Sequence, residues 1–399
     1  MPFKGSKNSP ERGSDMARKV KKMSNKRYFD YSLLFVIIFI VGFGLVMIYS
    51  TSSYTAQMEY GSSEYYFKKQ LIFDVLGFIM MYIMYRLDYH VLRKIAPAFF
   101  ALSLLLILAL IPFGKTANGA TRWIRFGPIG VQPADVSKTA VIIMLSAAVC
   151  AAGSKIKRLW YNFFLFVLIA GLEAILIMVI SSNMSSALII LAIAFVMIFV
   201  AYPKYKFFVV LAGLGAGGVA ALYNWLLGIA HQGMTENFRM NRLLMWIQPE
   251  NYSSGIGYQT VQGLYAIGSG GLWGLGLGQS RMKYLYIPEP QNDFIFAVVV
   301  EELGLVGALM ILLIFALLVW RGITLSLRAK DKFGKLLGIG LTSQIGIQVV
   351  LNILVITDWL PNTGISLPFF SYGGSSLIML LAQMGLVLSI SRTANIERQ

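Results

Sequence analysis

Long apolar runs separated by short polar segments make up most of this chain. A helix that spans a lipid bilayer needs about 20 mostly apolar residues, and ten stretches meet that requirement. They lie at 31–53, 69–87, 92–112, 134–152, 162–180, 185–201, 206–228, 293–320, 334–356 and 371–391. The fifth and sixth are separated only by SSNMSS, and reading them as one helix would leave nine spans. The pattern predicts an all-α, polytopic integral membrane protein with about ten transmembrane helices.

The composition indicates that lipid, rather than water, surrounds much of the protein surface. Apolar residues make up 57% of the chain and charged residues only 13%, whereas a soluble domain is about half apolar and a quarter charged. We expect one transmembrane domain at 28–392, preceded by a disordered basic tail at 1–27 and followed by a tail at 393–399. The single cysteine, Cys150, excludes an internal disulfide, and two histidines leave little for a zinc site.

The net charge of +16 indicates orientation rather than nucleic-acid binding, because the basic residues lie between the apolar runs. With ten spans, 24 Lys and Arg fall on the side of the termini and nine on the other, with Lys138 inside a helix. Basic residues are enriched on the cytoplasmic side of membrane proteins. We therefore predict that both termini are cytoplasmic and that the loops at 113–133 and 229–292 face outward.

Several ionisable residues fall within the predicted spans, where they are costly and usually paired or functional. Asp135 and Lys138 are three residues apart, so they share a helix face and can form an ion pair. A structural pair and a place in a substrate cavity are equally compatible with this spacing. The other acidic residues of this kind are Asp74, Glu173, Glu301 and Glu302.

The predicted outer loops gather cations. Arg122 and Trp123 combine a cation with an interfacial aromatic ring, a pair also typical of a membrane boundary. Arg239, Arg242 and Lys283 suit an anionic phosphate group at the membrane surface, although lipid headgroups would satisfy them too. The glycine-rich stretch between 263 and 278 contains no clean G-x-G-x-x-G, and we expect it to allow close packing or re-entrant backbone.

Asp293 stands at a polar-to-apolar boundary, after PEPQN, which includes Glu289, and before Phe294. Partial burial of a carboxylate raises its pKa and makes it a better base. An N-terminal helix cap is the simpler interpretation of an aspartate at a helix start, and the two roles are compatible.

Four segments together resemble the SEDS family of shape, elongation, division and sporulation proteins: GLVMIYSTSS, RWI with QPADVSK, IPEPQNDFIFAVVVEELG and LPFFSYGGSS. The resemblance extends from about 28 to 392 and is closer to the FtsW-like division and sporulation branch than to the RodA-like elongation branch. It implies ten transmembrane helices, cytoplasmic termini and a glycosyltransferase that polymerises lipid II at the outer face of the bacterial cytoplasmic membrane.

By the same resemblance, Asp293 matches the essential acid of the family, and Asp135 with Lys138 matches an acid-x-x-Lys pair in its central cavity. The family usually has Glu where Asp135 stands. It also often has an acid between the fifth and sixth spans, where this chain has Asn183. We expect the substrate-binding or cavity residues to be Asp135, Lys138, Arg239, Arg242, Lys283, Arg122, Trp123 and Glu289, with no protein-held metal.

The implied reaction transfers a lipid-linked glycan onto the sugar hydroxyl of lipid II, with inversion and release of undecaprenyl pyrophosphate. Asp293 would serve as the base, and a divalent cation such as Mg²⁺ or Mn²⁺ could stabilise the pyrophosphate. The implied partners are a class B penicillin-binding protein, which is a transpeptidase, and other divisome proteins. A lipid II flippase and a non-catalytic scaffold for a penicillin-binding protein remain the alternatives.

Overall fold

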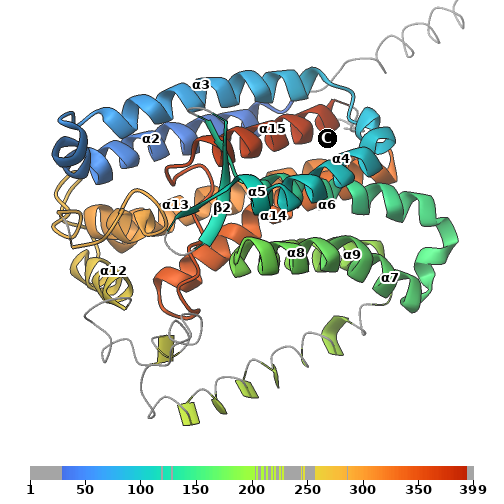
Figure 1. The fold of residues 1–399 in the computed structure, drawn as a ribbon. Helices are drawn as coiled ribbons and strands as arrows, with labels where there is room; N and C mark the ends of the chain where they lie inside the picture. The colour runs from blue at the N-terminus through green and yellow to red at the C-terminus, as the bar shows by residue number, and fades with distance from the viewer. Residues whose placement is uncertain are drawn as a thin grey trace, which may run out of the picture.

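The computed structural model describes residues 29–117, 120–126, 129–202, 257–284 and 286–392, together with isolated positions between 204 and 247. Long helices lie side by side in one bundle (Figure 1). Within the described residues, eight helical stretches are long and apolar enough to cross a membrane. The predicted all-α, multi-pass architecture is confirmed. The first part of the predicted loop at 229–292, up to 256 and with Arg239 and Arg242, lies mostly outside the described residues. About half of the residues of the predicted span at 206–228 also lie outside them.

The helices of the first half are α2 (Tyr31–Tyr60), α3 (Tyr65–Arg86), α4 (His90–Leu108), α5 (Leu110–Phe113), α6 (Pro133–Ala152), α7 (Leu159–Leu165), α8 (Leu172–Ile180) and α9 (Met184–Ala201). Those of the second half are α12 (Tyr258–Ser269), α13 (Ile295–Leu327), α14 (Lys332–Ile356) and α15 (Gly374–Ser391). The short helix η1 (Gly153–Lys157) follows α6, and the π-helical segment η2 (Phe166–Gly171) joins α7 to α8 in one span.

Helix α3 occupies the second predicted span, although its charged residues keep it out of the eight most apolar stretches. Its 22 residues are about 33 Å long, enough for one crossing. Helices α8 and α9 are separate, because Asn183 caps α9 by accepting a hydrogen bond from the Ser186 N–H. The prediction of two helices around SSNMSS is therefore confirmed.

The two described ends of the chain lie on the same side of the bundle. The Phe29 and Tyr85 rings are 5.2 Å apart, and the Arg392 guanidinium lies 5.1 Å from the centre of the Tyr85 ring. Chain ends on one side require an even number of crossings. The Ser185 hydroxyl at the start of α9 bonds the Thr363 carbonyl, on the same side as Asp293, so α9 runs back toward the side of the termini. The chain therefore passes to the opposite side between Ala201 and Asp293, as the ten-span prediction requires.

A three-stranded antiparallel sheet fills the first predicted outer loop, a feature that the apolar pattern did not predict. It consists of β1 (Gly114–Ala117), β2 (Ala120–Phe126) and β3 (Ile129–Val131), in the order β1-β2-β3. Ile124 on β2 is opposite Val131 on β3 and is buried. The sheet leads directly into α6, which begins with Pro133 and carries Asp135 in its first turn, as its sequence predicts.

Helix α13 is broken at Gly304, whose φ of 70° and ψ of −175° are not helical. The glycine-rich loop after α12 forms hydrogen bonds with the backbone groups that the break leaves without helical partners. The N–H groups of Leu275 and Gly276 donate to the Glu301 and Glu302 carbonyls, each at 2.9 Å. On the other side of the break, the Leu305 N–H donates to the Gly271 carbonyl at 2.9 Å. This satisfied, re-entrant backbone is what the glycine content predicted.

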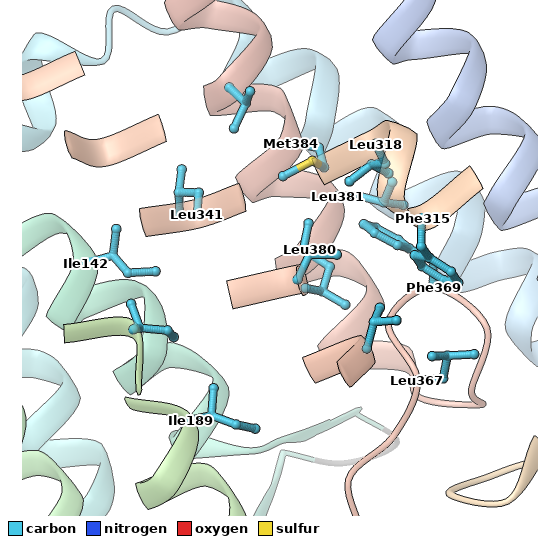
Figure 2. Packing of buried hydrophobic residues seen from close by; sticks show 14 of the residues in the cluster. Ile142, Ile189, Phe315, Leu318, Leu341, Leu367, Phe369, Leu380, Leu381 and Met384 are labelled. Carbon is cyan, nitrogen blue, oxygen red and sulfur yellow. The ribbon is translucent and has the colours of Figure 1, made fainter. Parts of the chain in front are cut away.

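The loop approaches α13 so closely that side chains would not fit. A Cβ added at Gly270 would lie 2.2 Å from the Val300 carbonyl oxygen, and one at Gly304 would lie 2.4 Å from the Gly274 nitrogen. The apolar core lies between the helices, where residues such as Phe315, Leu341 and Met384 interdigitate (Figure 2). This core fixes the frame on which the polar sites are built.

Candidate functional site

Asp293 lies immediately before α13, on the side of the bundle opposite the described chain ends. It is partly exposed, whereas the next residue, Phe294, is fully buried and occupies the N-cap position of the helix. Asp293 therefore stands one residue before the cap. The polar-to-apolar boundary seen in the sequence is a real boundary in space, with the carboxylate at its edge.

Arg122 and Asp293 converge beside Gly364. A Cβ placed on Gly364 would lie 3.0 Å from the Asp293 Oδ2 and 3.9 Å from the Arg122 Nη1. Burial lowers the pKa of the Arg122 guanidinium, and the Asp293 carboxylate opposes that shift. The side chain nevertheless stays charged, since an arginine is not deprotonated in proteins. A cation at this place stabilises the ionised carboxylate, the form that accepts a proton.

Asn352 on α14 holds the backbone of this region together. Its side-chain amide is fully buried and donates to the Asp293 carbonyl at 3.0 Å and to the Ile365 carbonyl at 2.6 Å. A second connection joins the same segments, because the Tyr372 N–H donates to the Gln291 carbonyl at 2.9 Å. The two most distinctive sequence segments, around 288–296 and 367–376, are therefore in direct contact.

Asp135 and Lys138 form the ion pair that their spacing predicts. The Lys138 Nζ lies 2.7 Å from the Asp135 Oδ1, and the two side chains are only 5% and 10% exposed. They line a narrow pocket with Gln344, Gln348 and Gln383. The Gln383 amide donates to the Thr139 hydroxyl at 2.7 Å. The geometric prediction of a pair is confirmed.

Several polar atoms of this cluster lack a hydrogen-bond partner among the described residues. The Asp135 Oδ2, the Gln348 Oε1 and the Gln383 Oε1 are buried and have no hydrogen-bond partner in the described part of the chain. Gln348 also lines a second pocket together with segment 366–373, and the Tyr372 N–H of that segment donates to the Gln291 carbonyl, two residues before Asp293. Unsatisfied buried polar atoms are costly in an apolar bundle. A bound polar group could satisfy these atoms, although the pocket that they line is too narrow to hold a water molecule in this structure.

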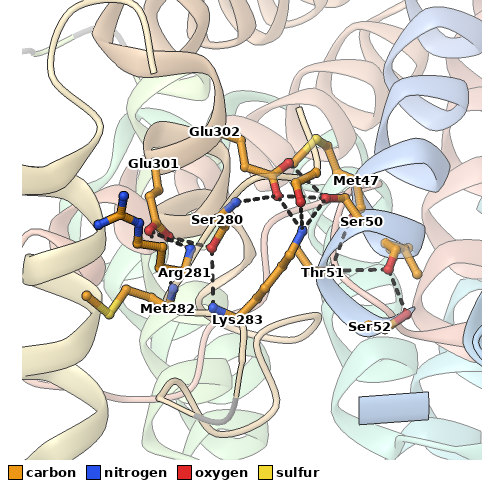
Figure 3. Close-up of polar contacts among 12 residues, drawn as sticks. Met47, Ser50, Thr51, Ser52, Ser280, Arg281, Met282, Lys283, Glu301 and Glu302 are labelled. Atoms are coloured by element: carbon orange, nitrogen blue, oxygen red, sulfur yellow. Dashed lines mark hydrogen bonds and ion pairs between the residues drawn. The ribbon is translucent and has the colours of Figure 1, made fainter. Parts of the chain in front are cut away.

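Lys283 lies in a buried network between the glycine-rich loop, α2 and α13 (Figure 3). Its Nζ is 3.0 Å from the Glu302 Oε1 and donates to the Gly278 carbonyl at 2.6 Å. The Ser50 hydroxyl of α2 bonds both oxygens of Glu302, at 2.7 and 2.8 Å. The ammonium of Lys283 is 3% exposed and the carboxylate of Glu302 fully buried, so the two charges neutralise each other.

Glu301 completes the network on the other face of the same helix. Its carboxylate accepts hydrogen bonds from the Ser280 hydroxyl at 2.5 Å and from the Arg281 N–H at 2.9 Å. The sequence placed both glutamates in a span without visible partners. The structure shows that they bind the loop that closes the break in α13, and their partners lie about 20 residues earlier in the chain.

The remaining predicted site residues are more peripheral. Trp123 packs over β3, where a Cβ on Gly130 would lie 3.3 Å from its ring. Glu289 is exposed in a tight turn, where its carboxylate accepts from the Asn292 amide at 2.7 Å. Within the described residues, no group of three His, Cys, Asp or Glu side chains could hold a metal ion.

Sequence reasoning missed Asn352 and Gly364, which lie against Asp293, and it did not single out Asp358. Asp358 lies in the segment after α14, with a φ of 60°, and burial raises its pKa to about 6. Polar residues at a helix end, before the glycine of Asn362-Thr363-Gly364, are a signal for a functional loop. Nothing in the sequence, however, pairs Asn352 with Asp293.

Comparison with known proteins places these features in one family. A model of the FtsW/RodA/SpoVE family, described as cell cycle protein, matches residues 31–396. Stage V sporulation protein E of Bacillus subtilis (strain 168) is 37% identical over 367 residues, covering 91% of this chain and 97% of that protein. A protein named "Probable peptidoglycan glycosyltransferase FtsW" from Geobacter sp. (strain M18) is 37% identical over 365 residues, covering 91% and 96%.

Solved structures agree with this relationship. One chain, described under "Structural coordination of polymerization and crosslinking by a peptidoglycan synthase complex", matches with a TM-score of 0.72 and 27% identity, covering 91% of this chain and 98% of that one. The rod shape determining protein RodA of Thermus thermophilus matches with a TM-score of 0.65 and 26% identity, covering 94% and 100%. This chain is therefore a multi-pass membrane protein that belongs to the FtsW/RodA/SpoVE, or SEDS, family.

Proposed function

We propose that this protein is a peptidoglycan glycosyltransferase that polymerises lipid II at the outer face of the cytoplasmic membrane, in cell division or sporulation. The single observation that carries the proposal is the position of Asp293, partly exposed at the end of the bundle beside the Arg122 guanidinium. The names of the relatives, FtsW and stage V sporulation protein E, support the same assignment.

The proposed reaction is a single inverting displacement. The Asp293 carboxylate takes the proton of the acceptor sugar 4-hydroxyl, whose oxygen attacks the anomeric carbon of the donor. The bond from that carbon to the pyrophosphate breaks, and undecaprenyl pyrophosphate leaves with the electron pair. An α-linked donor gives a β-linked product in one such step, so no covalent enzyme intermediate is needed.

Arg122 is the described cation best placed for this chemistry. Its guanidinium lies, like the carboxylate of the proposed base, beside Gly364, where it can bind a phosphate group or the ionised carboxylate. Arg239 and Arg242 remain proposed pyrophosphate ligands on sequence grounds. Lys283 is less suited to that role, because its charge is already neutralised by Glu302 inside the fold.

A divalent cation would have to be bound mainly by the substrate. Among the described residues, no group of acidic side chains could hold the ion, and the side chain beside Asp293 at Gly364 is the cation Arg122. Mg²⁺ commonly uses one or two carboxylates plus substrate phosphates. Polymerisation by the purified protein with and without EDTA tests this: equal rates would exclude a required cation.

Lipid II transport is the second candidate function, and one observation favours it. The Asp135–Lys138 pair and its unsatisfied polar neighbours lie inside the bundle, where a translocated headgroup would need them. A transporter has no need, however, for a carboxylate base at the outer surface. Reconstituting the purified protein with fluorescent lipid II separates the readings: glycan polymer supports polymerisation, and translocated but unpolymerised lipid supports transport.

The proposed partner is a class B penicillin-binding protein. The related solved chain comes from a peptidoglycan synthase complex that couples polymerisation to crosslinking, according to its description. An exposed apolar face of α13, with Leu309, Met310 and Leu313 at 55%, 63% and 69% exposure, is a suitable docking surface. Co-purification from native membranes that consistently lacks a transpeptidase would contradict this proposal.

A further inference from the structure

A cavity of about 370 Å³ lies at the end of the bundle where both described chain ends are found, far from Asp293. Its wall is formed by the end of α3, the α3–α4 turn and the end of α15, which are close together in Figure 1. The proposed polymerisation makes no use of this cavity, and none of the site residues discussed above lines it.

Two arginines, Arg86 and Arg392, line the cavity and bring positive charge to it. The Arg86 Nη1 donates to the Tyr82 hydroxyl at 3.1 Å, and the Arg392 Nη1 donates to the Tyr85 carbonyl at 3.0 Å. Each guanidinium carries five N–H donors, and neither forms an ion pair with a carboxylate among the described residues. Both cations are thus oriented by one hydrogen bond and keep donors for a ligand.

Among the described residues of the cavity wall, Asp88 carries the only carboxylate, and that carboxylate is already hydrogen-bonded. Asp88 pairs with the His90 Nδ1 at 2.6 Å and accepts from the His90 N–H at 3.0 Å. The hydrogen bonds from His90 are the main cause of the lowered pKa of Asp88, and the nearby charge of Arg392 contributes to it. The His90 Nε2 also lies 3.5 Å from the Asp331 Oδ1. Asp88 offsets part of the charge of Arg392, but two arginines against one carboxylate leave the cavity wall with a net positive charge.

Exposed apolar surface that suits lipid lies next to the cavity. Helix α3 leads to it with an exposed apolar stripe, on which Ile72, Ile79 and Ile83 are 60%, 52% and 50% exposed. Tyr82, at the end of the stripe, is 58% exposed, as expected for a ring at the membrane interface. A bound molecule could place acyl chains along this stripe and a charged group between the two arginines.

We propose that this cavity binds the phosphate group of an anionic phospholipid, with Arg86 and Arg392 as its ligands. Pockets of basic residues between transmembrane helices, on the side where positive charge gathers, suit such headgroups. Ser389, which lines the same cavity, adds a hydroxyl on the α15 side. The site would anchor α3 to α15 through the lipid, away from the polymerisation chemistry.

Native mass spectrometry of the delipidated, full-length protein with added phosphatidylglycerol tests the proposal. We expect phosphatidylglycerol to bind more tightly than phosphatidylcholine, and Arg86→Gln or Arg392→Gln to weaken it by about fivefold each, the effect of one basic residue near a membrane surface. Arg86→Lys keeps the charge and should keep most of the binding. Arg93→Gln, an exposed arginine of α4 outside the cavity wall, is the matched control and should bind like wild type.

Equal phosphatidylglycerol binding by the wild type and the two glutamine variants would overturn the proposal. Displacement of the lipid by millimolar inorganic phosphate would instead assign the cavity to a free anion and overturn the lipid assignment. Thermal unfolding of each variant guards against misfolding. If Arg392→Gln does not fold, the more exposed Arg86 carries the test alone.

Discussion

At the scale of single residues, the site depends on one glycine. Gly364 has a φ of 70°, and its missing side chain leaves room for Asp293 and Arg122. An alanine there adds backbone strain and pushes on the Asp293 carboxylate at the same time. Misplacing a catalytic group by about 1 Å can reduce turnover by roughly a hundredfold.

We therefore expect Gly364→Ala to lower lipid II polymerisation by about tenfold to a hundredfold. Gly61→Ala is the matched control, because Gly61 has the same φ of 70° with nothing within 4 Å of its added Cβ. Both variants should lose stability from left-handed strain, about 1–2 kcal/mol each, but only Gly364→Ala should lose activity. Equal polymerisation by the two variants would contradict the proposed packing around Asp293.

The Asp135–Lys138 pair makes a second residue-scale prediction. Lys138→Met leaves a buried, unpaired carboxylate, and loss of one partner of such a pair costs about 3–5 kcal/mol. Adding Asp135→Asn removes the orphaned charge and should recover part of the stability. Thermal unfolding of the purified single and double variants measures this coupling, and simple additivity would argue against a pair.

The activity of the Lys138→Met, Asp135→Asn double variant then distinguishes the two roles of the pair. A structural pair predicts that polymerisation returns with stability. A pair that contacts substrate in the cavity predicts a stable but inactive protein.

At the scale of elements, the broken helix α13 connects the glycine-rich loop to α2 and to the segment that carries Asp293. Lys283, Glu302 and Ser50 connect these segments inside the protein. Lys283→Met should destabilise the protein strongly, because the fully buried Glu302 loses its counter-charge. The Lys283→Met, Glu302→Gln double variant should unfold at a higher temperature than the single variant.

Polymerisation by this double variant separates structure from binding. If the role of Lys283 is to hold the loop, activity should recover in step with thermal stability. Restored stability with polymerisation still absent would instead show that Lys283 binds the pyrophosphate, as its sequence context suggested.

The sequence predicted elements well where a single physical requirement dominates. Lipid-facing helices need long apolar runs, so their positions follow from hydropathy, and Pro133 and Asn183 mark helix starts through local chemistry. The break at Gly304 escaped prediction because one glycine within an apolar run does not interrupt the hydropathy signal. The contact of Asn352 with Asp293 spans 59 residues, and local patterns carry no information on such pairs.

The sequence analysis did not predict the β-sheet, because the same residues had a second interpretation. Four of the seven residues of Ala120–Phe126 are β-branched or aromatic (Thr121, Trp123, Ile124 and Phe126), which is a strand signal. The membrane-boundary interpretation of Trp123 and its arginines accounted for the same residues. Arg122 was correctly included in the site, but its nearness to Asp293 depends on this sheet.

At the scale of the whole molecule, the side of the membrane on which Asp293 lies decides its access to substrate. The described chain ends share one side, and Asp293 lies at the other. The excess of basic residues on the side of the ends predicts that this side is cytoplasmic. In a Cys150→Ser background, a membrane-impermeant maleimide should label Gly255→Cys but not Gly5→Cys in intact cells. The reverse labelling pattern would place Asp293 on the cytoplasmic side and exclude the proposed reaction.

The central claim is that Asp293 is the general base, and Asp293→Asn tests it most directly. Asparagine keeps the size of aspartate but cannot accept the proton. Because Asp293 lies one residue before the N-cap of α13, the substitution removes no helix cap. Lipid II polymerisation by the purified variant should fall by roughly a hundredfold or more, with expression and thermal stability near those of the wild type. Near-normal polymer from Asp293→Asn would contradict the assignment of Asp293 as the catalytic base.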